Sequence, residues 1–254
     1  MDILLGSSVA VFLIGLAVMA IAAKVGSVLV TSRVAVQVGD LSQFSIIQSA
    51  TLTLLGLVIG FTFSMAVSRY DQRKNLEEEE ANAIATEYLR AALLPEADAA
   101  TVRVRLQQYL DQRIVWYSTT DEAQRRELDA ATAKTQDELW EVVRHDATAQ
   151  QTPVMALVAA GMNDVINSQG YTQAAWWNRI PPAGWLLLLV LAFFSNVLVG
   201  MGVQAKGHRA LIYVLPVIVA LAFVLIADID SPRRGLIAVS PRNLLTLAES
   251  LRPR

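Results

Sequence analysis

Residues 46–74 read IIQSATLTLLGLVIGFTFSMAVSRYDQRK, an uncharged run that ends in four closely spaced charges. Its apolar part, Ile46–Val67, is long enough to cross the hydrocarbon core of a bilayer, which takes about 20 residues. Neither Gly nor Pro occurs between Phe61 and Leu94, and Pro95 follows directly. The pattern predicts one helix from Ile46 to Leu94, roughly 70 Å long at about 1.5 Å per residue, that spans the membrane and continues into water.

Three further apolar runs are long enough to span a bilayer: Ile3–Ala23, Ala183–Val203 and Ala210–Ala227. Ala20-Ile21-Ala22 is compatible with signal-peptide cleavage, but Asp2 stands where a cation is usual and the run is too long, so we expect an uncleaved span. The sequence thus predicts an all-α membrane protein with four transmembrane helices and a helical cytoplasmic block between the second and third. The predicted parts are spans one and two at 1–67, the block at 68–180, spans three and four at 181–230, and a cytoplasmic C-terminal tail at 231–254.

The distribution of charge predicts the orientation. Only 17% of the residues are charged, against about 25% in an average soluble protein. Four spans place both termini and the block on one side, and the side with more flanking cations faces the cytoplasm. Six flanking cations accompany the block and four lie on the other side, which predicts a cytoplasmic block. The six are Arg69, Arg73, Lys74, Arg179, Arg233 and Arg234, and the four are Lys24, Arg33, Lys206 and Arg209.

The block itself is acidic and has helical periodicity. Between Arg69 and Arg179 it carries 18 acidic and 12 basic residues, which argues against nucleic acid as a partner because phosphate counterions would not be replaced. Apolar residues recur every three or four positions in stretches that begin at Val102, Leu128 and Val154, as amphipathic helices require. The block is therefore predicted to be helical throughout. The chain has no cysteine, which excludes disulfides and thiolate chemistry.

No pattern in the sequence indicates an enzyme or a metal site. His145 and His208 are the only histidines and fall on opposite sides of the membrane in this topology. No nucleophile elbow, phosphate-binding glycine loop or HExxH motif occurs. The four acids Glu77–Glu80 point about 100° apart around a helix and cannot converge on one ion. We expect a solvated face in a monomer and, in a ring of subunits, a ring of charge that attracts cations. We predict no enzyme activity, no cofactor and no metal.

The second span has two distinct faces. Leu55, Ile59 and Phe63 stand one turn apart on one face, either as lipid contacts or as a hydrophobic constriction that gates by dewetting. Small or hydroxylated residues recur every three or four positions on a roughly opposite face. They serve close helix packing, which is the better interpretation of the glycines, or a wet pore wall. This stripe comprises Ser45, Ser49, Thr53, Gly56, Gly60, Ser64 and Ser68.

Charged residues gather where the second and fourth spans end. An acid at the end of a span is costly unless it is paired or hydrated. We therefore expect a latch from Asp228 to Arg69 or Arg73, with ion conduction as the alternative role. Within the third span, Ser195-Asn196 is expected to join helices by hydrogen bonding. The candidate charges at this inner mouth are Arg69, Arg73, Glu77, Glu80, Asp228 and Asp230.

Several motifs resemble those of a bacterial family of bestrophin-like membrane proteins. The resemblance covers most of the chain beyond residue 45, including the second and fourth spans and both ends of the block. The motifs are Gly60-Phe61-Thr62-Phe63-Ser64, Ser68-Arg69-Tyr70-Asp71, Glu80-Ala81-Asn82-Ala83-Ile84, Tyr88-Leu89-Arg90, Asp228-Ile229-Asp230-Ser231-Pro232-Arg233-Arg234-Gly235-Leu236-Ile237 and Val239-Ser240.

The resemblance implies an ion channel of the bacterial inner membrane. It implies four spans, both termini inside, and a ring of subunits around one pore that the second span lines. It also implies a constriction of three bulky apolar residues one turn apart, a spacing that Leu55, Ile59 and Phe63 share.

The leading hypothesis is a homo-oligomeric ion channel that favours cations over anions, because its block is acidic. Its expected partners are the lipid bilayer, further copies of itself and inorganic ions. The alternative is a membrane-anchored interaction or signalling protein without a pore. A membrane enzyme acting on lipid or quinone has no catalytic constellation to support it.

Overall fold

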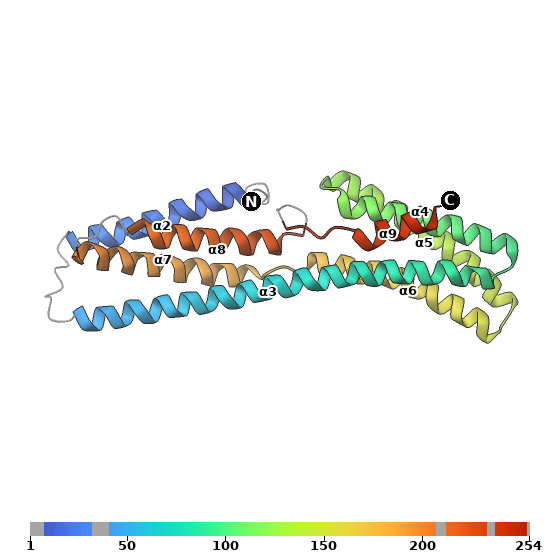
Figure 1. Ribbon diagram of the computed structural model, residues 1–254, viewed down its shortest axis with the longest axis horizontal. Coiled ribbons are helices and arrows are strands. Elements are labelled where there is room, and N and C mark those ends of the chain that lie inside the picture. Colours follow the sequence, from blue (N-terminus) through green and yellow to red (C-terminus); the bar gives the residue numbers. More distant parts are fainter. Residues whose placement is uncertain (1–7, 32–40, 207–211, 233–236, 253–254) are drawn as a thin grey trace. The chain divides into compact units, whose positions relative to one another are not determined.

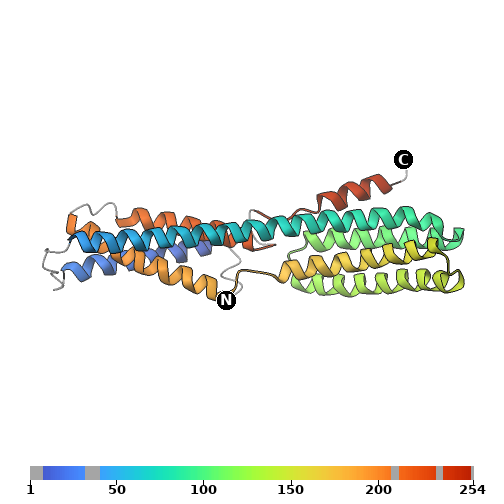
Figure 2. The same cartoon turned by 90° about the horizontal axis from the view of Figure 1, so that it is seen from below.

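The computed structural model describes residues 8–31, 41–206, 212–232 and 237–252, and within these ranges no residue forms a β-strand. The all-helical prediction therefore holds for the described part of the chain. The chain divides into two compact units, each shown in Figures 1 and 2. The first unit comprises Met1–Tyr70 and Arg179–Ala238, and the second comprises Asp71–Asn178 and Val239–Arg254.

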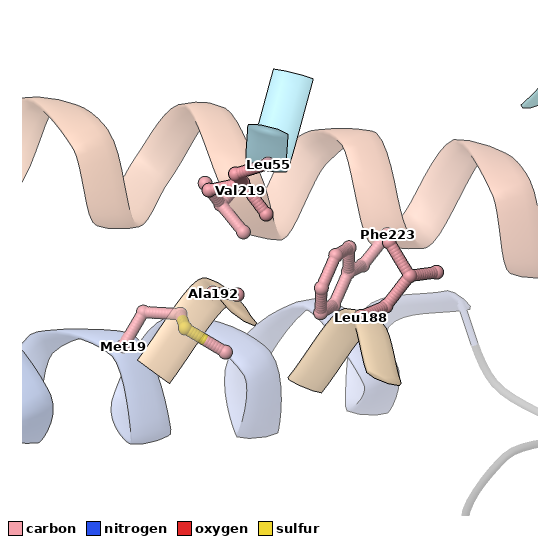
Figure 3. Close-up of a cluster of buried hydrophobic side chains, with 6 residues drawn as sticks. All are labelled: Met19, Leu55, Leu188, Ala192, Val219 and Phe223. Atoms are coloured by element: carbon pink, nitrogen blue, oxygen red, sulfur yellow. The ribbon is translucent and has the colours of Figure 1, made fainter. Parts of the chain in front are cut away.

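The first unit contains the apolar helices. They are α2 (Ser8–Thr31), residues 41–70 of α3 (Leu41–Arg90), α7 (Pro182–Lys206) and α8 (Val214–Asp230). Helix α2 packs against both α7 and α8. Figure 3 shows a core to which all four helices contribute. Its members are Met19 from α2, Leu55 from α3, Leu188 and Ala192 from α7, and Val219 and Phe223 from α8.

Two glycines bring the backbones of α2 and α7 into contact. A Cβ atom on Gly26 would lie 2.0 Å from the carbonyl oxygen of Val197, and one on Gly200 would lie 2.0 Å from that of Ala23. Small residues allow this approach, which matters in lipid because van der Waals packing is the main attraction between helices there. Asn196, in the same part of α7, donates from Nδ2 to the Ala192 carbonyl at 2.7 Å and lies 3.4 Å from Sδ of Met19.

The second unit contains the amphipathic helices predicted for the block. Residues 71–90 of α3 are followed by a 3-10 turn, η2 (Ala91–Leu93), and then by α4, α5, α6 and α9. Helix α4 packs against α5 and α9, and α5 packs against α6. Pro153 occupies the first turn of α6, and Thr152 caps that helix by accepting from the backbone N–H of Met155. The bounds are α4 Glu96–Ser118, α5 Glu122–Ala149, α6 Pro153–Trp177 and α9 Arg242–Leu251.

Helix α3 runs for 50 residues without a break, which confirms the predicted continuous helix, but its bounds are Leu41–Arg90 and not Ile46–Leu94. At about 1.5 Å per residue it is roughly 75 Å long, more than twice the thickness of a hydrocarbon core of about 30 Å. Only its uncharged part, which ends at Val67, suits lipid.

Three stretches of the described chain are long and apolar enough to cross a membrane: Val9–Leu29, Gln43–Leu93 and Pro153–Gly202. The first differs from its predicted range, because α2 continues beyond Lys24 to Thr31 and residues 1–7 lie outside the described ranges. A lysine such as Lys24 is tolerated near the end of a membrane helix, because its long apolar stem lets the charged ammonium group reach water. Helix α8 has 17 residues, at the lower limit for a span, so the fourth span stays a prediction.

Candidate functional site along helix α3

The stripe of small and hydroxylated residues lies on the exposed side of α3. A Cβ atom on Gly56 or Gly60 would meet no heavy atom of a neighbouring helix within 4 Å in the described part of the chain. The hydroxyl of Thr53 donates to the carbonyl of Ser49 at 2.9 Å, within its own helix. The stripe is therefore open to water or to another molecule. All its members are exposed, namely Ser45, Ser49, Thr53, Gly56, Gly60, Ser64 and Ser68.

The three residues of the predicted constriction lie in different surroundings. Leu55 is 2% exposed and belongs to the core of the first unit. Ile59 is half-buried and packs against two apolar clusters of that unit. Phe63 is 38% exposed, and at about 100° per residue it lies only about 20° around the helix from Gly56. Of the three, Phe63 alone borders the exposed stripe.

A second exposed sector of α3 is strongly apolar. Leu54, Leu57 and Phe61 are all exposed there, and around the helix they lie about 100° to about 160° from Gly56. The exposed surface of α3 thus changes from large apolar to small and hydroxylated side chains within about one quarter of its circumference. The two sectors suit different environments.

Asp228 and Asp230 bind backbone and side-chain groups at one end of the first unit. Nη1 of Arg69 lies 3.7 Å from Oδ1 of Asp230, and the backbone N–H of Ile180 donates to the same oxygen at 3.1 Å. Asp228 accepts from the backbone N–H of Ile237 at 2.9 Å. The ion pair of Arg69 therefore reaches Asp230 rather than the predicted Asp228, and both acids connect the end of α8 to other segments.

In the second unit, the buried face of α3 is charged. Arg73, Glu77, Glu80, Ile84 and Glu87 follow one another at steps of four and three residues, which places them on one face, and all five are buried. The predicted solvated face is therefore wrong for Glu77 and Glu80. Successive side chains on a helix point about 100° apart, so a run of four acids is divided between the buried and the exposed face.

Two of these charges lie at helix ends whose partial charge has the opposite sign. Glu77 accepts from the backbone N–H groups of Asn243 and Leu244 at 2.9 and 3.0 Å, and from Nδ2 of Asn243 at 2.6 Å. It thereby caps the N-terminus of α9, where a helix dipole favours an anion. Arg73 donates to the carbonyls of Ala175 and Asn178 at 3.2 and 3.0 Å, at the C-terminus of α6, where the dipole favours a cation.

Glu80 is held by a buried network. Arg113 forms an ion pair with it, and the hydroxyls of Tyr117 and Thr172 donate to its Oε2 at 3.1 and 3.2 Å. The guanidinium of Arg113 also lies over the ring of Trp116, 4.4 Å from its centroid. Burial raises the pKa of Tyr117, so its hydroxyl keeps the proton that it donates to Glu80. This network explains part of the Glu80-Ala81-Asn82-Ala83-Ile84 motif.

Within the described residues, no group of three or more His, Asp or Glu side chains could hold a metal ion. Sequence reasoning missed the Glu80–Arg113 pair, the cap on α9 and the glycine contact between α2 and α7. The spacing of Arg73, Glu77, Glu80 and Glu87 was a signal for the first two, because it is the spacing of a buried helix face. Isolated glycines in two separate spans offer no comparable signal.

Comparison with known proteins identifies relatives of this arrangement. The family described as Bestrophin-like domain matches residues 17–244. A bacterial bestrophin homologue from Klebsiella pneumoniae superposes with a TM-score of 0.64 at 16% identity, covering 95% of this chain and 99% of that one. A single-substitution variant of that homologue gives 0.66 at 15% identity, covering 96% and 98%. None of the curated proteins is similar enough to count as a match.

Proposed function

The chain belongs to the bestrophin-like family, and from this premise we propose that it forms a homo-oligomeric ion channel whose pore is lined by α3. In this proposal α2, the first part of α3, α7 and α8 cross the bacterial inner membrane, while the second unit and both termini lie in the cytoplasm. The excess of flanking cations beside the second unit supports that orientation. The apolar residues exposed along α8, such as Ile218 and Leu221, support a fourth span.

The observation that carries the proposal is the exposed stripe on α3. Glycines and hydroxyls offer little apolar surface to lipid, yet Thr53, Gly56 and Gly60 face away from their own bundle. Several copies of α3 around a common axis would turn this stripe to a wet lumen, where hydroxyls are tolerated. The neighbouring apolar sector, with Leu57 and Phe61, would then face adjacent subunits or lipid.

Phe63 is the residue that we assign to a constriction. It is the most exposed of the three predicted gate residues and lies beside the stripe. A constriction that used Leu55 and Ile59 as well would require α3 to turn about its axis, away from the core that now holds Leu55. That arrangement is the alternative gate.

The exposed charges that follow the stripe favour cations. Asp71 lies eleven residues after Gly60, about three turns, and Glu78 lies seven residues after Asp71, about two turns. Both are exposed, and their spacing of seven residues places them on one face of the helix. In a ring of subunits Asp71 and Glu78 would form rings of negative charge that attract cations. Glu77 and Glu80 are buried and cannot take this role.

Ion flux from liposomes that contain the purified protein tests this function. We expect cation flux under an ion gradient or an applied voltage. Phe63→Ala should change gating because it removes a bulky side chain from the constriction. Gly60→Leu should reduce the flux and leave the particle mass unchanged, because it adds a large apolar side chain to the wall of the lumen. The absence of flux under every gradient and voltage, or identical behaviour of the two variants, would contradict the proposal.

A membrane-anchored interaction protein is the second candidate. Large apolar side chains are exposed on the second unit, among them Leu89, Tyr171 and Trp177, and exposed apolar surface can serve partner binding. This candidate predicts no conductance. It also predicts that function survives replacement of the membrane spans by unrelated ones, whereas a channel would lose its function.

A further inference from the structure

Glu87 is a buried acid that lacks the partners found for Glu77 and Glu80. Its side chain is 0% exposed, and within the described part of the chain neither carboxylate oxygen has a hydrogen-bond partner. Nη1 of Arg90 approaches its Oε2 to 3.9 Å and donates to the carbonyl of Leu157 in α6 at 3.3 Å. A buried carboxylate without hydrogen bonds is costly, because its ionised form has lost its hydration.

Helix α6 leaves no space around this acid. A Cβ atom on Gly161 would lie 2.0 Å from Oε2 of Glu87 and 2.2 Å from Nη1 of Arg90. The carboxylate, the guanidinium and the backbone of α6 therefore meet at one point. A change in the charge of Glu87 acts directly on the contact between the end of α3 and the first half of α6.

Two charged groups act on Glu87 from the elements around it. Burial raises the pKa of Glu87 from 4.5 to about 7, while Arg90 on its own helix lowers that pKa and Asp164 on α6 raises it. The adjoining turn η2 (Ala91–Leu93) has no charged residue. The carboxyl thus gains and loses its proton near neutral pH.

We propose that Glu87 is a proton-binding site that makes the contact between the end of α3 and α6 depend on pH. Ionised Glu87 attracts Arg90 and keeps it on the Leu157 carbonyl. Protonated Glu87 no longer attracts Arg90, whose partly exposed guanidinium then turns towards water. The second unit as a whole is more stable in the protonated form, since it buries one charge less. This regulatory input goes beyond conduction and does not depend on a pore.

A fluorescent reporter on α6 tests the inference. The chain has no cysteine, so Leu157→Cys, at an exposed position, gives the purified full-length chain one site for an environment-sensitive dye. Its fluorescence is followed between about pH 5.5 and about 8.5, a window centred on neutral pH. We expect a transition with a midpoint at about pH 7. Glu87→Gln, which resembles the protonated acid, should abolish it, and Glu127→Gln, at an exposed position in α5, should leave it unchanged.

Two further variants separate titration of Glu87 from an indirect effect. Arg90→Gln should move the midpoint to higher pH, and Asp164→Asn should move it to lower pH, because the two charges act on Glu87 in opposite directions. Opposite shifts support the inference even if Glu87→Gln does not fold. A wild-type chain without a transition, a transition that survives in Glu87→Gln, or shifts in one direction only would overturn it. Ion flux plays no part in this experiment, so its outcome is independent of the proposed channel.

Discussion

Glu80 and Arg113 form an ion pair in which neither side chain is exposed to solvent. Glu80 comes from α3 and Arg113 from α4. The hydroxyls of Tyr117 in α4 and Thr172 in α6 donate to Oε2 of Glu80. Three helices of the second unit therefore meet at one buried carboxylate. Since an unpaired charge in this position would be poorly solvated, we expect the pair to favour this packing of the three helices over others.

Breaking this pair should destabilise the second unit strongly. Arg113→Met leaves Glu80 buried without its cation, and we expect a loss of about 3–5 kcal/mol in the free energy of unfolding. Chemical unfolding followed by the fluorescence of Trp116 and Trp176 measures this loss. The control is Arg144→Met, which removes the exposed pair with Glu141 and should have no measurable effect, since exposed pairs contribute little. Equal effects of the two variants would contradict the structural role of the buried pair.

Glu77 should determine whether α9 stays docked. Glu77→Ala removes three hydrogen bonds at the N-terminus of α9, and loss of a helix cap costs about 1 kcal/mol. We expect faster hydrogen exchange in residues 242–251, measured by mass spectrometry. Glu78→Ala changes the exposed neighbour and should leave exchange in α9 as it is. If α9 exchanges at the same rate in both variants, Glu77 does not hold it.

Added methyl groups distinguish the glycines of the first unit. Gly26→Ala and Gly200→Ala push a Cβ atom onto the facing backbone, and overpacking of this kind costs about 1–3 kcal/mol. Gly56→Ala adds the same group where no neighbouring helix lies within 4 Å, so the fold of one chain should tolerate it. Unfolding of the detergent-solubilised protein by a denaturing detergent compares the three. A larger loss at Gly56 than at Gly200 would be incompatible with the packing described.

Glu87 should make stability depend on pH in a defined direction. Its pKa rises from 4.5 to about 7 on folding, so the folded chain binds this proton more tightly than the unfolded chain does. The resulting stability is fully present below about pH 4.5 and is lost as the pH rises through about 7. In thermal unfolding, the difference in melting temperature between wild type and Glu87→Gln should therefore change over this window. A constant difference would show that Glu87 has the same pKa in both states.

The sequence was sufficient for the helical architecture because the signals are local. The uncharged run before Arg69, the absence of Gly and Pro up to Leu94, and the helical periodicity from Val154 each predict an element directly. Pairings between distant residues left weaker signals. Arg113 can be matched to Glu80, or Asp230 to Arg69, only when α4 and α8 have been placed beside α3.

The two faces of α3 illustrate the same limit. Periodicity suggested a face with Leu55, Ile59 and Phe63 roughly opposite the glycine stripe, but Phe63 lies only about 20° from Gly56, and periodicity could not tell which face packs within the chain. That choice depends on the partners of α3, since Leu55 fits a core made by α2, α7 and α8. The acids Glu77–Glu80 were similarly interpreted as one solvated group, whereas helix geometry divides them between two environments.

Single cysteines in planar bilayer recordings can show whether the small-residue stripe of α3 lines a pore. Thr53→Cys lies on the stripe and Leu54→Cys lies on the apolar sector, about 100° around the helix, and both positions are exposed in one chain. We expect that a charged thiol reagent changes the current through Thr53→Cys and leaves the current through Leu54→Cys unchanged. The absence of any current, or modification that acts only through Leu54→Cys, would contradict it.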